Sequence, residues 1–362
     1  MSKGNISLGA MKNSSTLALT QQSLALTEVK CFVDQSLLAR CMRIFVYCFI
    51  IIVSLVGNSL VLTIVHRNKT MRKPIHSFIV NLSCSDLLIT TVYMPRVVVI
   101  FAVGGYQWLL DGALGTVACK LVPFIYEVSV TVSILTVVAV SAERFFLLVF
   151  PFKAFLNKRR AKFIVLSIWI TAVAFRLPIC YAINLKEVDN NIFCNMMLDQ
   201  EFGFGTEKIY YQVILVAMYA VPMATIVILY SVIIVSLKRH KNPRVAFLRR
   251  EESQKGQRSN SVFKMILIVV GAFVLCWMLY FIQLILYSYK VFVPCEVLFV
   301  RWVFAHSNSA LTPCLYFTSS EVFRDGLTDV FAKCFRAFRM ECHCCNQYTK
   351  TVRMQELQQL NF

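Results

Sequence analysis

Seven long apolar segments lie between Phe45 and Phe317, and most of them carry a polar residue or a proline where lipid disfavours one. Each segment is long enough to cross the hydrocarbon core of a bilayer, roughly 30 Å thick, as an α-helix. Because a polar group in hydrocarbon is costly unless the protein satisfies it internally, such residues indicate functional machinery rather than a simple anchor. They fall one per segment and are Asn58, Asp86, Arg144, Trp169, Pro222, Trp277 and Pro313.

The composition places the chain among polytopic helical membrane proteins, since 58% of its 362 residues are hydrophobic and only 15% are charged. We predict an all-α membrane protein, in which a seven-transmembrane helix bundle is followed by a short cytosolic amphipathic eighth helix at about 321–335. A charged stretch at 249–260, rich in Ser and Gln, is typical of a mobile cytosolic linker. The predicted membrane helices cover approximately 43–66, 74–102, 116–149, 162–183, 209–238, 260–290 and 296–318.

Lys and Arg are concentrated in the loops that follow the first, third and fifth segments, whereas the loop between the fourth and fifth segments is acidic. The positive-inside rule places the basic loops in the cytosol and the amino terminus outside the cell. This predicts a multi-pass plasma-membrane protein with an extracellular tail at 1–42, a helix domain at 43–318 and a cytosolic region at 319–362. The net charge of +18 does not indicate nucleic-acid binding, because the positive residues lie in loops rather than in a basic groove.

Two cysteines fall on the predicted outer side, Cys119 at the start of the third segment and Cys194 in the acidic loop. In an oxidising compartment they would form a disulfide that pins this loop over the bundle, and two free thiols are the alternative. Cys31 and Cys295 are also on the outer side and are candidates for a second bridge by parity alone.

Other candidate modification sites lie in the two terminal regions. Asn5 and Asn13 each begin an Asn-x-Ser sequon in the outer tail and are candidate glycosylation sites. Cysteines that follow the amphipathic segment are candidates for S-palmitoylation, and a zinc site at 342–345 is a weaker alternative. These cysteines are Cys334, Cys342, Cys344 and Cys345.

Short motifs in all seven segments together resemble those of a rhodopsin-class G-protein-coupled receptor. Any one of them is weak evidence, but their order and spacing across roughly 43–335 are specific. The motifs are Gly57-Asn58, the run Asn81-Leu82-Ser83-Cys84-Ser85-Asp86-Leu87, Cys119 with Glu143-Arg144-Phe145, Trp169, Pro222 with Tyr230, Phe273 with Cys276-Trp277, and Pro313 with Tyr316.

The resemblance implies a receptor that binds an extracellular ligand and activates a heterotrimeric G protein by outward movement of the sixth helix. Arg144 follows Cys119 by 25 residues, roughly 37 Å of helix, and therefore reaches the cytosolic face. Glu143 would hold the Arg144 guanidinium at rest, and an arginine that merely extends to interfacial water is the alternative. The residues that the resemblance assigns to the activation switch are Glu143, Arg144, Tyr230, Phe273, Trp277, Pro313 and Tyr316.

Asp86 lies about 13 residues, or roughly 20 Å, inward from Lys73 and hence near the bilayer centre. With Asn58, Ser133 and Asn308 it resembles the sodium and water cluster of the family. A neutral, hydrogen-bonded Asp86 without an ion is the alternative. We expect no other cofactor than this candidate allosteric Na⁺.

The ligand is predicted mainly by exclusion. His306 stands where opsins carry the lysine that attaches retinal, and Tyr126 stands where amine receptors carry an aspartate, so the resemblance favours neither ligand. An acidic outer loop above aromatic and charged groups is most similar to neuropeptide receptors. A non-peptide small molecule or a lipid is the alternative ligand. For each candidate ligand-binding residue, the alternative is that its side chain only packs inside the bundle. The candidate ligand-binding residues are Tyr126, Glu127, Arg176, Tyr280, Gln283, Trp302 and His306.

Leu279 departs from the family pattern, because it stands where the sixth helix usually carries a kinking proline.

The sequence does not favour two other classes of protein. A transporter would show repeated halves with helices broken at matching positions, which the sequence lacks. An enzyme is not indicated, because the spans contain no paired catalytic motif.

Overall fold

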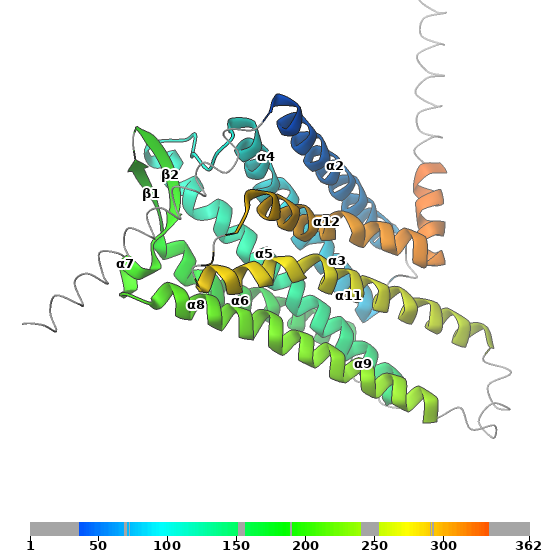
Figure 1. The fold of residues 1–362 in the computed structure, drawn as a ribbon. Helices are drawn as coiled ribbons and strands as arrows, with labels where there is room; N and C mark the ends of the chain where they lie inside the picture. Colours follow the sequence, from blue (N-terminus) through cyan, green and yellow to red (C-terminus); the bar gives the residue numbers. More distant parts are fainter. Residues whose placement is uncertain are drawn as a thin grey trace, which may run out of the picture.

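The computed structural model describes residues 36–68, 71, 73–150, 156–188, 190–239, 253–289, 291 and 293–332. Long helices run side by side through most of this part of the chain, and a two-stranded sheet lies at one end of the bundle (Figure 1). We call this end the hairpin end. Several predicted sites lie outside the described residues, namely Asn5, Asn13, Cys31, Cys334, Cys342, Cys344 and Cys345.

Helices occur at all seven of the predicted membrane positions. In chain order they are α2 (Leu37–Arg67), α3 (Pro74–Leu88) continued by η1 (Ile89–Tyr93) and α4 (Met94–Val103), α5 (Gly112–Val149), α6 (Lys158–Ala182), α8 (Thr206–Leu215) continued by η2 (Val216–Ala220) and α9 (Val221–Arg239), α11 (Ser253–Ser288), and α12 (Cys295–Ser319).

Two predicted boundaries differ from the structure by more than five residues. The first helix begins at Leu37, inside the predicted tail, because Ser36 caps it by accepting a hydrogen bond from the Ala39 amide at 3.3 Å. The predicted linker at 249–260 is wrong from Ser253 onward, since α11 begins there. That stretch contains Gln, Lys and Arg, which favour helix, and no proline that would prevent it.

Six of the described helical regions are long and apolar enough to cross a membrane, judged by length and composition, and α12 is not among them. Its 25 residues include Arg301, His306 and Asn308, which lower its apolar character. His306 and Asn308 are nevertheless buried, at 0% and 3% exposed, and α12 packs against α2 and α11. Several polar groups in the middle of α12 therefore face the interior of the bundle, whereas Glu296 at its start is exposed.

Two of the predicted helices contain a short π-helical segment. The segment η1 ends two residues before Pro95, and η2 ends two residues before Pro222. Proline has no backbone N–H and its ring crowds the preceding turn, so the backbone widens there to accommodate it. The continuous helices predicted at 74–102 and 209–238 are each interrupted in this way.

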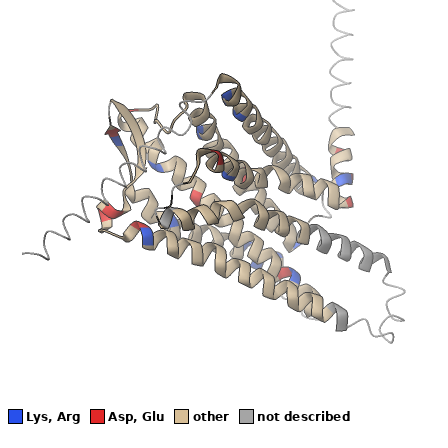
Figure 2. Ribbon diagram, viewed as in Figure 1, with Lys and Arg blue, Asp and Glu red and all other residues tan. Residues whose placement is uncertain are grey.

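Charged residues are sparse along the helices (Figure 2). Polar groups nevertheless cross-link the helices in the interior. Trp169 Nε1 of α6 donates a 2.8 Å hydrogen bond to the Asn81 side chain in α3, which in turn donates to Thr136 of α5 at 2.7 Å. Asn81 is 4% exposed. Three helices are thus joined through one buried amide whose donor and acceptor are both used.

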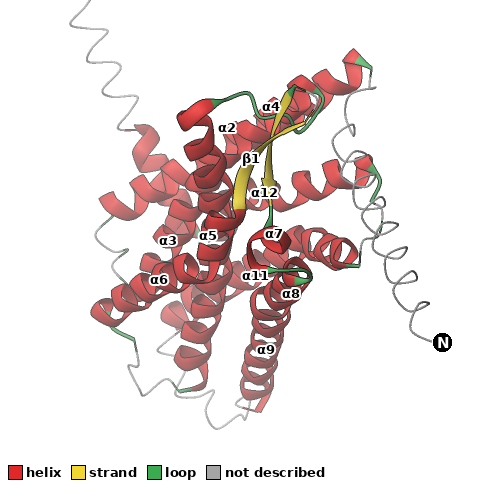
Figure 3. Cartoon of the chain, turned by 90° about the vertical axis from the view of Figure 1, so that its left-hand side faces the viewer, coloured by secondary structure: helices red, strands yellow, loops and turns green. Residues whose placement is uncertain are grey.

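The segment between α6 and α8 forms a β-hairpin where the sequence predicted only an acidic loop (Figure 3). Strand β1 (Ile183–Val188) pairs antiparallel with β2 (Asn191–Met196), and Leu185 lies opposite Cys194. Asn190 in the turn adopts a positive φ of 59°, which asparagine tolerates better than most residues. A short helix, α7 (Leu198–Phe202), follows the hairpin and leads into α8.

Residues 321–332 are also helical, and this segment packs against α2 and α12. Phe323 is 2% exposed and stacks on Tyr316, with ring centroids 5.3 Å apart. Gly326 lies directly against Ile64, and a Cβ atom at this position would collide with that side chain. Phe331 departs from the predicted amphipathic pattern, because 58% of it is exposed.

Candidate functional site

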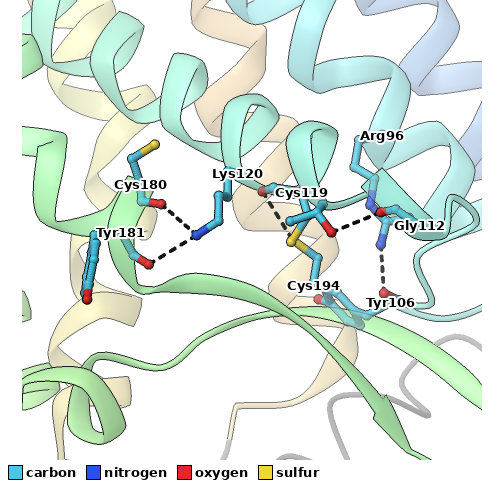
Figure 4. The surroundings of a disulfide bond; sticks show 9 residues. Arg96, Tyr106, Gly112, Cys119, Lys120, Cys180, Tyr181 and Cys194 are labelled. Carbon is cyan, nitrogen blue, oxygen red and sulfur yellow. Dashed lines mark hydrogen bonds between the residues drawn. A yellow bond between two sulfur atoms is a disulfide. The ribbon is translucent and has the colours of Figure 1, made fainter. Parts of the chain in front are cut away.

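The hairpin is held to the bundle by the predicted disulfide between Cys119 of α5 and Cys194 of β2 (Figure 4). On the same turn of α5, Lys120 Nζ donates to the carbonyl oxygens of Cys180 and Tyr181 at 3.4 and 3.3 Å, near the end of α6. The amide of Trp108 donates to the carbonyl of Ile192 at 2.7 Å. The hairpin is therefore attached both to α5 and to the loop before α5.

A buried ion pair lies among the predicted ligand-binding residues. Nη1 of Arg176 in α6 lies 3.0 Å from Oε2 of Glu127 in α5, and the two side chains are 3% and 16% exposed. Tyr280 of α11 donates a 2.9 Å hydrogen bond to Oε1 of the same carboxylate. Both oxygens of Glu127 are thereby engaged, as a charge largely removed from water requires.

The guanidinium of Arg176 extends this network to a fourth helical region. Its Nε donates to Oγ1 of Thr131 at 2.9 Å, and its Nη1 lies 3.5 Å from the hydroxyl of Tyr210. Thr131 lies one turn below Glu127 on α5, and Tyr210 belongs to α8. The charge network therefore connects α5, α6, α8 and α11.

His306 of α12 lies in a packed aromatic cluster that we call the aromatic floor, formed by Tyr47, Tyr93, Tyr126 and His306. His306 Nδ1 forms a hydrogen bond with the Tyr47 hydroxyl, and its Nε2 lies 3.3 Å from the hydroxyl of Tyr126. Tyr93 stacks on Tyr126 with centroids 3.9 Å apart. His306 is fully buried and Tyr126 is 4% exposed, so in this conformation both are packed against other side chains.

Trp302 lies one turn of α12 nearer the hairpin end than His306. Its ring is 5.8 Å from that of Phe101 and 5.8 Å from that of Tyr106, and 4% of the residue is exposed. The guanidinium of Arg301 lies over the rings of Tyr280 and Trp302, at 5.5 and 5.2 Å from the centroids. Gln283, one turn along α11 from Tyr280, is 9% exposed, and its Oε1 has no hydrogen-bond donor among the described residues.

Asp86 is fully buried in a second polar cluster. Its Oδ1 accepts a 2.8 Å hydrogen bond from Ser309, whereas its Oδ2 has no hydrogen-bond partner within the described part of the chain. Asn58 donates to the Ser309 carbonyl at 2.9 Å, and its own Oδ1 likewise has no partner there. Ser133 forms a 2.9 Å hydrogen bond with Ser85. Unpaired buried oxygens of this kind fit a small hard cation or ordered water.

Arg144 lies near the opposite end of α5 from Cys119 and forms an ion pair with the neighbouring Glu143. The Nε to Oε2 distance is 2.6 Å, and the two side chains are 7% and 10% exposed. A small apolar cavity lies nearby between α3, α5, α11 and α12, and Tyr316 contributes to its lining. The remaining residues of the predicted switch are also buried. They are Tyr230, Phe273, Trp277 and Tyr316, each at most 6% exposed, and Pro313.

A sequence model described as "7 transmembrane receptor (rhodopsin family)" matches residues 57–316, which is most of the chain. The chain belongs to this family. Membership makes the protein a receptor rather than an enzyme or a transporter, and it accounts for α12 as the seventh span despite its polar residues.

Several proteins named as peptide receptors are similar to this rhodopsin-family receptor. Neuropeptide FF receptor 2 of Mus musculus is 28% identical over 308 residues, which cover 80% of this chain and 72% of the relative. A QRFP-like peptide receptor of Branchiostoma floridae is 30% identical over 247 residues, covering 67% and 63%. The substance-K receptor of Homo sapiens is 25% identical over 315 residues, covering 84% and 73%.

The structure brings Glu127, Arg176 and Tyr280 of this receptor together in the ion-pair network, and it brings Tyr126 and His306 together in the aromatic floor. Trp302 contacts Arg301, Phe101 and Tyr106 instead. Gln283 is placed only by its position one turn along α11 from Tyr280.

Sequence reasoning missed Arg301, although a charged residue inside a membrane segment is itself a signal of function. It also missed Tyr47 and Tyr210, which carry no such signal, because tyrosine is common in membrane helices. Their roles depend on which face of each helix turns inward.

Proposed function

We propose that the protein is a plasma-membrane receptor that binds an extracellular peptide and activates a heterotrimeric G protein. The observation that carries this proposal is the set of similar proteins, which are named as receptors for neuropeptide FF, QRFP-like peptides and substance K. The hairpin pinned by Cys119 and Cys194 supports it, because a fixed hairpin beside a buried ion pair and an aromatic cluster offers polar and aromatic contacts to a peptide.

The hairpin end is the extracellular end in this proposal, and the amino terminus lies outside. The positive-inside rule supports this orientation, because Arg67, Lys73 and the run Lys158 to Arg160 lie at helix ends that the chain places opposite the hairpin. Asn5 and Asn13 would then be accessible for glycosylation. Cys295 is disulfide-bonded, and Cys31 is the partner that this topology favours.

In the proposed mechanism the peptide contacts Trp302, Gln283 and Tyr280, together with the charge network of Glu127 and Arg176. Gln283 supplies an unpaired buried acceptor for a donor of the peptide. Tyr280 connects these residues to Trp277, whose ring lies 5.4 Å from that of Tyr280 in an edge-on arrangement. Ligand contact at Tyr280 therefore acts on α11 one turn above the switch residues.

On activation α11 moves outward and the ion pair between Glu143 and Arg144 opens, so that Arg144 meets the G protein. Arg144 is suited to this role because its guanidinium remains charged and offers several donors once Glu143 releases it. The same movement of α11 involves the other switch residues in this proposal, namely Tyr230, Phe273, Pro313 and Tyr316. The G protein is the cytosolic partner, and lipid surrounds the helices.

Asp86, Ser133 and Asn308 would hold a sodium ion in the resting state. The unpaired Oδ2 of Asp86 and Oδ1 of Asn58 support this assignment, because hard cations take oxygen ligands. Bound sodium would supply positive charge beside Asp86 at the centre of the bundle.

The helical segment at 321–332 is proposed to lie along the inner membrane surface as an eighth helix. Its packing through Phe323 and Gly326 supports this position, since both residues face the bundle. Palmitoylation at Cys334, Cys342, Cys344 or Cys345 would add an anchor just after it.

The test is a library of neuropeptides applied to membranes that contain the receptor, with nucleotide exchange on added G protein as the readout. At least one peptide should accelerate exchange in a saturable manner, and membranes without the receptor should not respond. If only non-peptide compounds or lipids accelerate exchange, the peptide assignment is wrong.

A further inference from the structure

Arg301 of α12 carries a positive charge for which the described residues supply no acidic partner. The ion pairs in this part of the chain are Glu143 with Arg144 and Glu127 with Arg176. The Nε atom of Arg301 is buried and has no hydrogen-bond acceptor among the same residues. Because a guanidinium partly removed from water is best satisfied by a carboxylate or a similar anion, Arg301 lacks the group that it would bind most strongly.

The surroundings of Arg301 are aromatic. Its guanidinium lies over Tyr280 and Trp302, and the Trp302 ring is 5.8 Å from that of Tyr106. The nearby Arg96 of α4 is already engaged, because it donates a 2.7 Å hydrogen bond to the carbonyl of Tyr106 and lies over the ring of Trp108. Arg301 is therefore surrounded by rings and not by acidic groups.

The carboxylate of Glu127 does not compensate for the charge of Arg301. Both oxygens of Glu127 are engaged, one by Arg176 at 3.0 Å and the other by Tyr280 at 2.9 Å. Glu127 is therefore already paired with Arg176 and does not neutralise Arg301. With Glu127 and Arg176 neutralising each other, the charge of Arg301 remains uncompensated among these residues.

We infer that Arg301 is an anion-binding subsite of the proposed peptide site and that it receives a carboxylate of the ligand. The inference rests on the proposed function, since Tyr280 and Trp302, over which Arg301 lies, are assigned to the peptide there. The carboxylate is either the free carboxyl terminus of the peptide or an acidic side chain. Tyr280 and Trp302 hold the guanidinium plane and present apolar surface to the part of the ligand beside its carboxylate.

Thermal unfolding of the purified full-length chain with small probes tests the subsite without any signalling readout. N-acetylphenylalanine carries a terminal carboxylate, and N-acetylaspartylphenylalaninamide carries a side-chain carboxylate. Their neutral counterparts are N-acetylphenylalaninamide and N-acetylasparaginylphenylalaninamide. At least one acid should raise the unfolding midpoint saturably while its neutral counterpart does so much less, and the acid that responds identifies the source of the carboxylate.

The difference between acid and neutral probe should disappear in Arg301→Gln. It should persist in Arg67→Gln, which removes the same charge from an exposed position at the other end of the bundle. In Arg301→Lys the acid should still stabilise the protein, but at concentrations several-fold higher, because lysine cannot offer two parallel donors.

If Arg301→Gln does not fold, the lysine variant alone provides the test. Equal effects of acid and neutral probes on the natural protein, or an undiminished difference in Arg301→Lys and Arg301→Gln, would overturn the inference.

The active peptide from the library provides a second test. Replacing its critical carboxylate by a carboxamide should lower its potency about ten- to a hundredfold on the natural receptor and little on Arg301→Gln. A peptide whose potency is unchanged by amidation of every carboxylate would refute the subsite while leaving the receptor function standing. Stabilisation by the acid probes without any active peptide would refute the peptide assignment instead.

Discussion

A Cβ atom on Gly57 of α2 would lie only 2.6 Å from Cγ of Pro313 in α12, so the two helices touch through a position that only glycine fits. Gly57→Ala forces α2 and α12 apart beside Asn58 and the Asp86 cluster. We expect a loss of stability of about 1–3 kcal/mol, typical of overpacking in a close-packed interior. The measurement is thermal unfolding of the purified receptor together with its amount at the cell surface.

Gly271→Ala is the matched control, because a Cβ on Gly271 of α11 meets nothing within 4 Å. The same chemical change should be neutral there, or slightly stabilising, since alanine favours helix over glycine. Equal loss for Gly57→Ala and Gly271→Ala would mean that the close approach to Pro313 is unimportant.

Cys194→Ala should strongly lower surface expression and ligand binding, because it releases the hairpin from α5. Cys180→Ala removes a free thiol at the end of α6 and should have little effect. Binding of a radiolabelled active peptide, counted against surface receptor, measures both variants. Mass spectrometry that finds either Cys119 or Cys194 as a free thiol in functional receptor would remove the basis of the prediction.

The positions of the membrane helices could be predicted because a bilayer demands long apolar segments with internally satisfied backbones. For example, α5 was predicted at 116–149 and runs over Gly112–Val149. The hairpin could not be predicted in the same way. Strands β1 and β2 are held by the disulfide to α5 and by contacts with the loop before α5, such as the hydrogen bond from the Trp108 amide to Ile192. These are tertiary contacts, which a local sequence pattern does not reveal.

The candidate site was predictable where a residue type is unusual for its setting. Glu127 and Arg176 stand out as charges within apolar segments, but the sequence did not reveal that they pair. That pairing depends on how α5 and α6 are rotated relative to each other. The hydrogen bond between Tyr47 and His306 could not be predicted either, because it depends on how α2 and α12 are rotated relative to each other.

The charge network makes a distinctive prediction for variants of Glu127 and Arg176. Glu127→Gln leaves the Arg176 guanidinium buried without its counter-ion, and we expect a loss of about 3–5 kcal/mol in unfolding free energy. Arg176→Gln should cost a similar amount for the converse reason. The double variant should be less destabilised than the sum of the two, because neither charge is then unpaired.

Thermal unfolding of the four proteins in this cycle gives the coupling energy. Simple additivity of the two single losses would show that Glu127 and Arg176 do not stabilise each other. Thr131→Val is a useful companion, since it removes only one neutral acceptor of Arg176 and should cost less than either charge variant.

Leu279→Pro tests how α11 moves. A proline in a straight helix costs about 3 kcal/mol, but it costs little where the helix already bends. We expect Leu279→Pro to be tolerated and to alter basal exchange, because Phe273, Cys276, Trp277 and Tyr280 keep the family's packing pattern around this point. Loss of Leu279→Pro from the cell surface, with Leu279→Ala expressed normally, would show that α11 moves without the family's hinge.

The most direct measurement is peptide-stimulated nucleotide exchange by the natural receptor, Arg144→Ala and Glu143→Gln at matched surface levels. The account predicts saturable stimulation of the natural receptor and no stimulation of Arg144→Ala despite nearly unchanged peptide binding. It also predicts raised exchange without peptide in Glu143→Gln, where the 2.6 Å ion pair is lost. Full stimulation of Arg144→Ala, or no peptide that stimulates the natural receptor, would contradict the account.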